Sequence, residues 1–144
     1  MIGRMFDSTA MRVLSQALSA AGLNHQVITH NLANVDTPGF KRSEVLFQSR
    51  LAAALAEQEN QGEVLQGART DARHLAIGAP ADPGAVAPEV VVRAETTLRP
   101  DGNNVDLDAE MVKLSENTLM YQTMAQLVRE QFTELRSVIT EGRK

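Results

Sequence analysis

The chain has 144 residues, a formal net charge of −4 and no cysteine. The acidic balance argues against a nucleic-acid partner, because binding phosphates requires a basic surface, and the lack of cysteine excludes disulfides and thiolate metal sites. Tryptophan is absent and aromatic residues make up 3% of the chain, which leaves little bulky side chain to line a ligand pocket.

The first residues carry one arginine but no apolar segment with a small-residue cleavage site, so we expect no secretory signal. No apolar run approaches the roughly 18 residues of a membrane span, and we expect no direct membrane insertion. A chain that leaves the cytoplasm without these signals needs another route.

Near the N-terminus, apolar residues recur every three or four positions, and Asp7 or Ser8 is expected to cap the helix that they predict. The repeat runs through Met11, Leu14, Leu18, Ala21, His25, Ile28, Leu32 and Val35. A repeat of 3.5 residues stays on one side of a helix only if that helix packs against another as a coiled coil. The segment Met11–Val35 is therefore predicted to be a helix with a helical partner.

The same segment is unusual because no Lys, Arg, Asp or Glu occurs from Val13 to Val35. A soluble helix normally shows a charged face to water. We therefore predict that neighbours enclose this helix on several sides. Gly22 lowers helix propensity by about 1 kcal/mol, which a close approach of another helix would explain.

The first helix is expected to end at a turn. Pro38 disfavours helix at Thr37, and Pro38-Gly39 at the centre of four residues is typical of a type II turn with positive φ at the glycine. A second, shorter helix is predicted at Glu44–Gln58, with Leu51 and Leu55 on one face.

Glycine and proline recur in the middle of the chain, from about residue 62 to 104. We interpret it as a small β-containing or extended insert, in which His74–Ile77 and Glu89–Leu98 have the character of strands. Asp101-Gly102 is predicted to form a turn.

The last helix is predicted at Leu107–Glu141, capped by Asp106 or Asp108, with Glu110 favourable near the N-terminal end of the helix dipole. A second repeat runs along it through Leu107, Met111, Leu114, Thr118, Tyr121, Ala125, Val128, Phe132, Leu135 and Ile139. The larger apolar members of the two repeats define the predicted assembly seam: Leu14, Leu18, Ile28, Leu32, Leu107, Met111, Leu114, Tyr121, Val128, Phe132, Leu135 and Ile139.

The predicted fold class is mainly α, with long terminal helices packed as a coiled coil, a short middle helix and a small extended or β-containing insert. We divide the chain into residues 1–42 (first helix and turn), 43–104 (middle helix and insert) and 105–144 (last helix).

Residue patterns of catalysis are missing. His25 and His30 are five residues apart, about 140° around a helix, and no metal-ligand spacing accompanies them or His74. No phosphate-binding loop, dinucleotide fingerprint or nucleophile elbow occurs. His25 fits better as a polar position that sets the register of the coiled coil than as a ligand. We predict a protein that is not an enzyme and uses no cofactor or metal.

The acidic residues Asp106, Asp108 and Glu110 can be interpreted as a cation site or as a capped helix start, and the second interpretation is favoured. Asn31 and Asn34 have two equally favoured interpretations. They are either simple cap and turn residues or residues with a specific further role.

Two segments carry a family resemblance. Residues 31–41, Asn-Leu-Ala-Asn-Val-Asp-Thr-Pro-Gly-Phe-Lys, resemble the N-terminal signature of bacterial flagellar rod and hook proteins. Residues 99–108 resemble the motif that precedes the last helix in proximal rod subunits of that family, and the His-Pro motif usual in the other small proximal rod protein is absent. The motif residues are Asn31, Asn34, Asp36, Thr37, Pro38, Gly39, Phe40, Asp101, Gly102, Asn103, Asn104 and Asp106.

The resemblance implies a structural subunit of the periplasm-spanning rod of the flagellar basal body, exported uncleaved through the flagellar type III export apparatus. It implies as partners copies of the chain itself, other rod proteins and the adaptor FliE near the inner-membrane ring. The alternative is a soluble secreted or regulatory coiled-coil module that binds a partner helix without polymerising. Such a module should carry charge on its outer face, which Val13–Val35 lacks.

Overall fold

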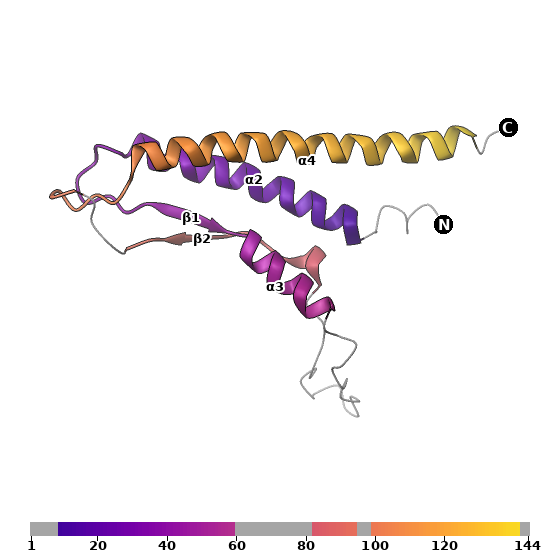
Figure 1. The fold of residues 1–144 in the computed structure, drawn as a ribbon, viewed down its shortest axis with the longest axis horizontal. Helices are drawn as coiled ribbons and strands as arrows, with labels where there is room; N and C mark the ends of the chain where they lie inside the picture. Colours follow the sequence, from indigo (N-terminus) through magenta and orange to yellow (C-terminus); the bar gives the residue numbers. More distant parts are fainter. Residues whose placement is uncertain (1–8, 60–81, 95–98, 142–144) are drawn as a thin grey trace, which may run out of the picture.

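The computed structural model describes residues 9–59, 82–94 and 99–141. Two long helices and a short one accompany a two-stranded antiparallel sheet, so the predicted mainly α class is confirmed (Figure 1). In chain order the elements are α2 (Thr9–Ala33), β1 (Ser43–Leu46), α3 (Gln48–Glu59), the 3₁₀ turn η2 (Pro83–Ala85), β2 (Glu89–Val92) and α4 (Leu107–Glu141). None of the described helices is long and apolar enough to cross a membrane.

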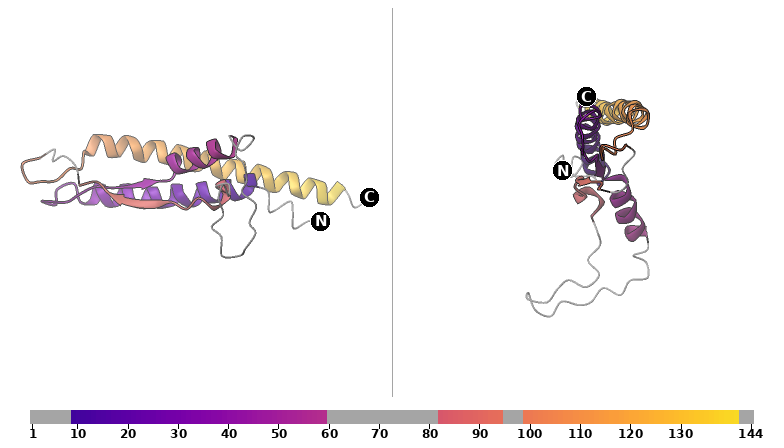
Figure 2. Two further views of the ribbon diagram at one scale, coloured as in Figure 1. Left: turned by 90° about the horizontal axis from the view of Figure 1, so that it is seen from below. Right: turned by 90° about the vertical axis from the view of Figure 1, so that its left-hand side faces the viewer.

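The two long helices lie side by side in opposite directions and form a helical hairpin (Figures 1 and 2). At one end, Asn31 near the end of α2 contacts Glu110 in the first turn of α4. At the other end, α4 runs on beyond the start of α2 at Thr9 (Figure 1). The first part of α4 therefore has a partner helix within the chain, and its last turns extend past that partner.

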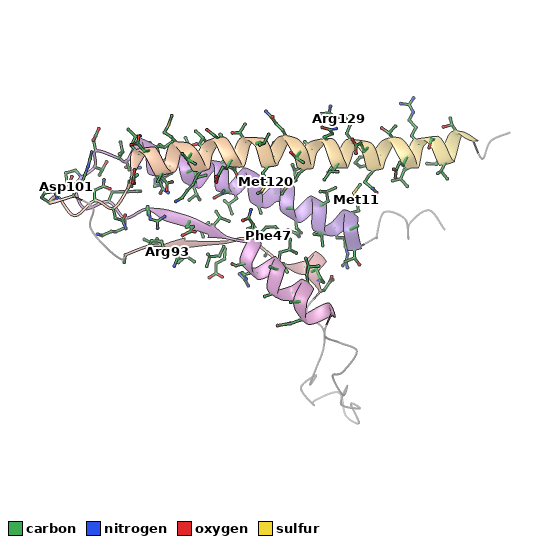
Figure 3. All side chains as sticks on the ribbon, viewed as in Figure 1. Met11, Phe47, Arg93, Asp101, Met120 and Arg129 are labelled. Carbon is green, nitrogen blue, oxygen red and sulfur yellow. The ribbon has the colours of Figure 1, made fainter. Side chains whose placement is uncertain are left out.

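The strands lie beneath α2. β1 pairs with β2 in a register that places Ser43 opposite Val92 and Leu46 opposite Glu89. A small apolar core forms where β1 passes into α3, around Phe47 (Figure 3). It consists of Ala17, Ala20 and Phe47, with Val45, Leu51, Val86 and Met124 packed against them. The short alanine side chains let the strand and α4 approach α2 closely.

The predicted second helix, Glu44–Gln58, begins later than expected, because Ser43–Leu46 is strand β1 and helix starts only at Gln48. The reason lies outside the segment. Asn31 on α2 bonds both the N–H and the C=O of Ser43, which holds the backbone extended, and β2 supplies the remaining ladder. The hydrogen bonds to these distant partners outweigh the local preference of the segment for helix.

Other boundaries follow the sequence closely. The last helix has the predicted bounds, and the Asp106 carboxylate caps it by accepting from the N–H groups of Asp108 at 3.0 Å and Ala109 at 3.2 Å. The first helix ends at Ala33, two residues before its predicted end. The strand expected at Glu89–Leu98 is present as Glu89–Val92.

The remaining expectations lie outside the described residues. They are the cap at Asp7 or Ser8, the strand at His74–Ile77 and the end of the second predicted strand at residues 95–98.

Candidate assembly interface

The two motif segments, far apart in sequence, dock onto each other at the end of the hairpin where Asp101 is labelled (Figure 3). The Gly39 N–H donates to the Asp101 carbonyl at 2.9 Å, and Lys41 Nζ donates to the Gly102 carbonyl at 2.7 Å. The Asn104 N–H donates to the Phe40 carbonyl at 3.4 Å. Residues 31–41 and 99–108 therefore form one structural unit.

Asn103 joins this unit to the end of α2. Its side chain is fully buried, and Nδ2 donates to the carbonyls of Asn34, Val35 and Thr37 at 2.9–3.0 Å. Its Oδ1 accepts from the Val105 N–H at 2.7 Å. The carbonyls of the turn that follows α2 need partners, and this one amide contacts three of them.

Both segments turn at a glycine with positive φ. Gly39 has φ 71° and Gly102 has φ 82°, a region that residues with a Cβ rarely adopt. The Phe40 N–H donates to the Thr37 carbonyl at 3.3 Å and closes the predicted turn. The positive φ expected for Gly39 is confirmed.

The rest of the first motif fixes the same turn. Asn34 Nδ2 donates to the His30 carbonyl at 2.8 Å, and its Oδ1 accepts from Thr37 Oγ1 at 3.2 Å. Arg99 reaches across to the Asp36 carboxylate at 3.2 Å. The Phe40 ring lies edge-on to His30 with centroids 5.4 Å apart, whereas Pro38 is exposed.

Asn31 has a specific role that goes beyond a simple cap or turn residue. It is fully buried, with its amide bonded to both backbone groups of Ser43. Its Nδ2 also donates to Glu110 Oε2 at 2.9 Å, and the other oxygen of that carboxylate accepts from Lys113 Nζ at 2.7 Å. Glu110 is 2% exposed, so burying its charge depends on these partners. This network ties α2, β1 and α4 together.

Two of the three acidic residues at the start of α4 have partners within the chain. Asp106 serves as the helix cap and Glu110 is held by Asn31 and Lys113. Among residues 9–59, 82–94 and 99–141, no group of three or more His, Asp or Glu side chains is placed to hold a metal ion.

Asn104 and an ion pair extend the strand pair toward the motif unit. Asn104 Oδ1 accepts from the Arg42 N–H at 2.7 Å, and its Nδ2 donates to the Arg93 carbonyl at 2.6 Å. Arg93 Nε donates to Glu44 Oε2 at 2.9 Å. This hydrogen bond outweighs the effect of burial and holds the pKa of Glu44 below its ordinary value, with Arg42 and Lys113 adding to the attraction.

The structure brings part of the predicted seam to the hairpin. On α2, Ile28 is buried, and the three leucines of the seam are half-buried: Leu14, Leu18 and Leu32. On α4, Leu114, Val128 and Leu135 are half-buried. The remaining seam residues of α4 are exposed in the single chain: Leu107, Met111, Tyr121, Phe132 and Ile139.

Sequence reasoning missed two residues that join the helices. Asn24 Nδ2 on α2 donates to Asn117 Oδ1 on α4 at 3.0 Å, and the buried Asn117 donates to the Ala21 carbonyl at 3.0 Å. The inward side of α4 follows Glu110, Asn117 and Met124, one position before each of Met111, Thr118 and Ala125. These three residues are seven positions apart in the sequence. Because two of them are polar, an apolar repeat does not include them.

The uncharged side of α2 is not enclosed within the described part of the chain. Ser15, Ser19, Gln26 and Thr29 are exposed. A Cβ at Gly22 would meet no atom within 4 Å. The close approach expected there therefore does not come from any described residue of the same chain.

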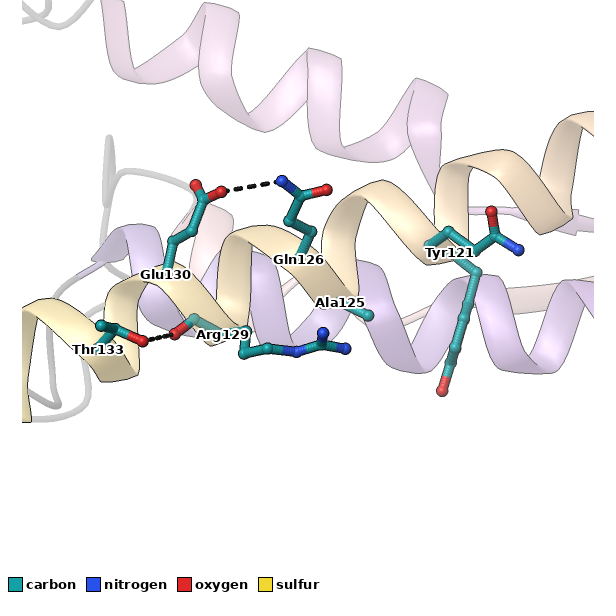
Figure 4. Close-up of a pocket in the computed structure, with 7 residues that line it drawn as sticks. Tyr121, Ala125, Gln126, Arg129, Glu130 and Thr133 are labelled. Atoms are coloured by element: carbon teal, nitrogen blue, oxygen red, sulfur yellow. Dashed lines mark hydrogen bonds between the residues drawn. The ribbon is translucent and has the colours of Figure 1, made fainter.

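One surface hollow lies entirely on α4, where it is lined by Tyr121, Ala125, Arg129, Thr133 and their neighbours (Figure 4). Gln126 Nε2 donates to Glu130 Oε1 at 3.0 Å within it. A hollow with walls from a single helix cannot enclose a substrate. It is part of the outer surface of the hairpin.

Comparison with known proteins agrees with this arrangement. Residues 11–41 match the family described as Flagella basal body rod protein. The flagellar basal body rod protein FlgB of Bacillus subtilis (strain 168) is 35% identical over 139 residues, covering 96% of this chain and 98% of that protein. The chain belongs to the FlgB family of flagellar basal body rod proteins.

Other FlgB proteins are similar over most of their length. The protein of Borreliella burgdorferi is 33% identical over 123 residues, covering 85% of this chain and 89% of that protein. The protein of Yersinia enterocolitica is 29% identical over 133 residues, covering 92% of this chain and 95% of that protein. Membership of the FlgB family makes the chain a structural protein of the flagellar basal body and connects it with motility.

Proposed function

We propose that the chain is a subunit of the proximal rod, and that it assembles with itself and with other rod proteins through α2 and α4. The observation that carries this proposal is the pair of faces that the hairpin leaves open. One is the uncharged side of α2, and the other is the row of exposed apolar residues along α4. Large apolar side chains exposed together on a surface are typical of a site of protein association.

This geometry assigns the segments of the chain to a rod core and an outer part. Residues 1–42 and 105–144 form the rod core in this proposal, and residues 43–104 form an outer part that the network at Asn31 fixes to the hairpin. The assembled rod acts as a drive shaft, so the subunit contributes stiffness and requires no chemistry.

The family suggests the partners. They are copies of the chain, the other rod proteins, the adaptor FliE near the inner-membrane ring and, during transit, the flagellar type III export apparatus. The assembled chain then lies in the periplasm-spanning rod.

The proposal is tested by a charge on the open face of α4. Tyr121 is 44% exposed, so Tyr121→Asp should leave the helix content of the purified subunit unchanged. In an assembled rod it buries a carboxylate at every copy, which costs several kcal/mol per interface. We expect no complete rods by electron microscopy of basal bodies and no swimming.

Gln122→Asp is the matched control, because it places the same charge one residue away on an exposed position outside the seam. Normal rods from the Tyr121→Asp strain would contradict assembly through this face. A soluble module that does not polymerise would be absent from purified basal bodies of a motile strain.

A further inference from the structure

A cleft of about 490 Å³ opens between α4, α2 and the corner where β1 passes into α3. Its α2 side is made of small residues, Ala17, Ala20 and Ala21, so a bulky side chain from outside can come close to that helix. The large apolar residues of the other walls are Phe47 and Leu51 on one side and Met120 and Met124 on the other, and Gln48 Nε2 donates to Met120 Sδ at 3.2 Å between them.

The chemistry of this cleft suits apolar side chains rather than a polar small molecule. The two amides that border it, Asn24 and Asn117, are bonded to each other. Methionine is flexible and adapts its shape to what it contacts. An apolar groove along a helix is typical of sites that accept the anchors of another helix.

The chain itself carries a segment with such anchors. Val128, Phe132, Leu135 and Ile139 occur at i, i+4, i+7 and i+11 near the end of α4, which is the spacing of one helix face. Phe132 is 51% and Ile139 is 56% exposed, whereas Val128 and Leu135 are half-buried in the single chain. This part of α4 cannot enter the cleft of its own chain, because α4 is one continuous helix and its middle, at Met120 and Met124, forms a wall of that cleft.

Charge favours the same pairing. Arg129 and Arg136 are seven residues apart, so they share one side of α4 next to these anchors. The rim of the cleft carries the exposed Glu116, Glu44, which is paired with Arg93, and Lys113, which is paired with Glu110. An arginine beside the anchors would therefore meet the carboxylate of Glu116, which guides the orientation of association.

We propose that the cleft binds the last turns of α4 from a second copy of the chain. This inference rests on the proposed rod function and specifies one of its contacts. The cleft and the anchors are different surfaces of the same molecule, about 20 Å apart along α4. Such a contact is head-to-tail, and repeated contacts of this type build an open helical assembly rather than a closed dimer.

The test uses two differently tagged full-length copies in a strain that has no other copy. One carries Ser49→Cys at the cleft and the other carries Ile139→Cys among the anchors. Because the chain has no cysteine of its own, a disulfide that joins the two differently tagged copies can form only between these two introduced cysteines. After mild oxidation of purified basal bodies, we expect a disulfide-linked dimer that carries both tags.

Two matched controls use exposed positions outside the proposed contact. Ser137→Cys lies two residues from Ile139, about 200° around the helix, and Glu57→Cys lies on α3 outside the cleft. Ser137→Cys is combined with Ser49→Cys, and Glu57→Cys is combined with Ile139→Cys. Each combination should give at least about tenfold less of the dimer that carries both tags.

The results separate this inference from the rod function. Basal bodies that contain both tagged copies but yield no dimer, or as much dimer with Ser137→Cys, would overturn the docking of α4 in the cleft and leave the rod function standing. If neither copy is present in basal bodies of a swimming strain, both proposals are wrong.

Discussion

At the scale of single residues, asparagine makes the junctions of this molecule. A primary amide donates and accepts at once, so one side chain can satisfy backbone groups that lie in different directions. Asn31 does this for both groups of Ser43, and Asn104 does it between Arg42 and Arg93. Aspartate lacks the donor, and leucine lacks both functions, so neither can replace these residues.

Asn103 is the residue whose loss we expect to cost most at the motif end. Asn103→Ala removes a buried donor from three carbonyls and the acceptor of the buried Val105 N–H, which should lower the free energy of unfolding by about 1–3 kcal/mol. Urea unfolding of the purified subunit, followed by circular dichroism, measures this change. Gln26→Ala, at an exposed amide on α2, should change stability by less than about 0.5 kcal/mol. Equal effects of the two substitutions would contradict the role assigned to Asn103.

The lowered pKa of Glu44 predicts that the folded subunit loses stability in acid. Its pKa is lowered in the folded state, chiefly by the hydrogen bond from Arg93, so its contribution is present above the ordinary pKa of 4.5 and is lost as pH falls through the folded pKa. Both side chains are about one third exposed, which limits the contribution to about 1 kcal/mol or less. Glu44→Gln should lower stability at pH 7 and flatten its decline below pH 4.5 in unfolding curves. Parallel pH profiles of the two proteins would exclude this ion pair as a stabilising contact.

At the scale of elements, α4 is held unevenly. Its first part is fixed by Glu110 and Asn117 against α2, whereas its last turns extend beyond Thr9 and expose Val138 and Ile139 (Figure 1). A long helix in water owes most of its stability to packing. The two ends of α4 should therefore open independently in the free subunit.

Hydrogen exchange detects this difference. In the purified subunit, amides of residues 110–120 should exchange at least about tenfold more slowly than those of residues 130–141, which corresponds to about 1.4 kcal/mol of opening free energy. In isolated basal bodies the second segment should become protected as well. Uniform protection along α4 in the free subunit would show that its last turns need no partner.

The two long helices were predictable because their signals are local. Apolar spacing and the Asp106 cap are both visible within Leu107–Glu141, and Pro38-Gly39 marks its own turn. Strand β1 and the role of Asn31 were not predictable, since their partners lie elsewhere. Asn31 bonds Ser43 at a separation of 12 residues and Glu110 at a separation of 79. A single sequence contains no signal that joins such positions.

At the scale of the whole molecule, the two ends have different characters. The end that holds the motifs is closed by buried amides and backbone hydrogen bonds. The opposite end leaves apolar residues of α4 exposed, and the side of α2 around Gly22 carries no charge. In the proposed assembly, the hydrogen-bonded end would hold the fold of the subunit and the open surface would contact its neighbours.

A substitution at Gly22 should affect the stability of the subunit and the assembly of the rod in opposite directions. Outside the neighbouring backbone of α2, no described atom lies within 4 Å of a Cβ at this position, and glycine within a helix is less favourable than alanine by about 0.5–1 kcal/mol. Gly22→Ala should therefore stabilise the free subunit by that amount in urea unfolding. If another subunit packs closely on this side of α2, the same methyl group must obstruct the rod, and swimming should decline although the subunit is more stable. Ala52→Ser, a small change at an exposed position on α3, should leave swimming intact. Undiminished swimming of the Gly22→Ala strain would mean that no neighbour packs closely against this side of α2.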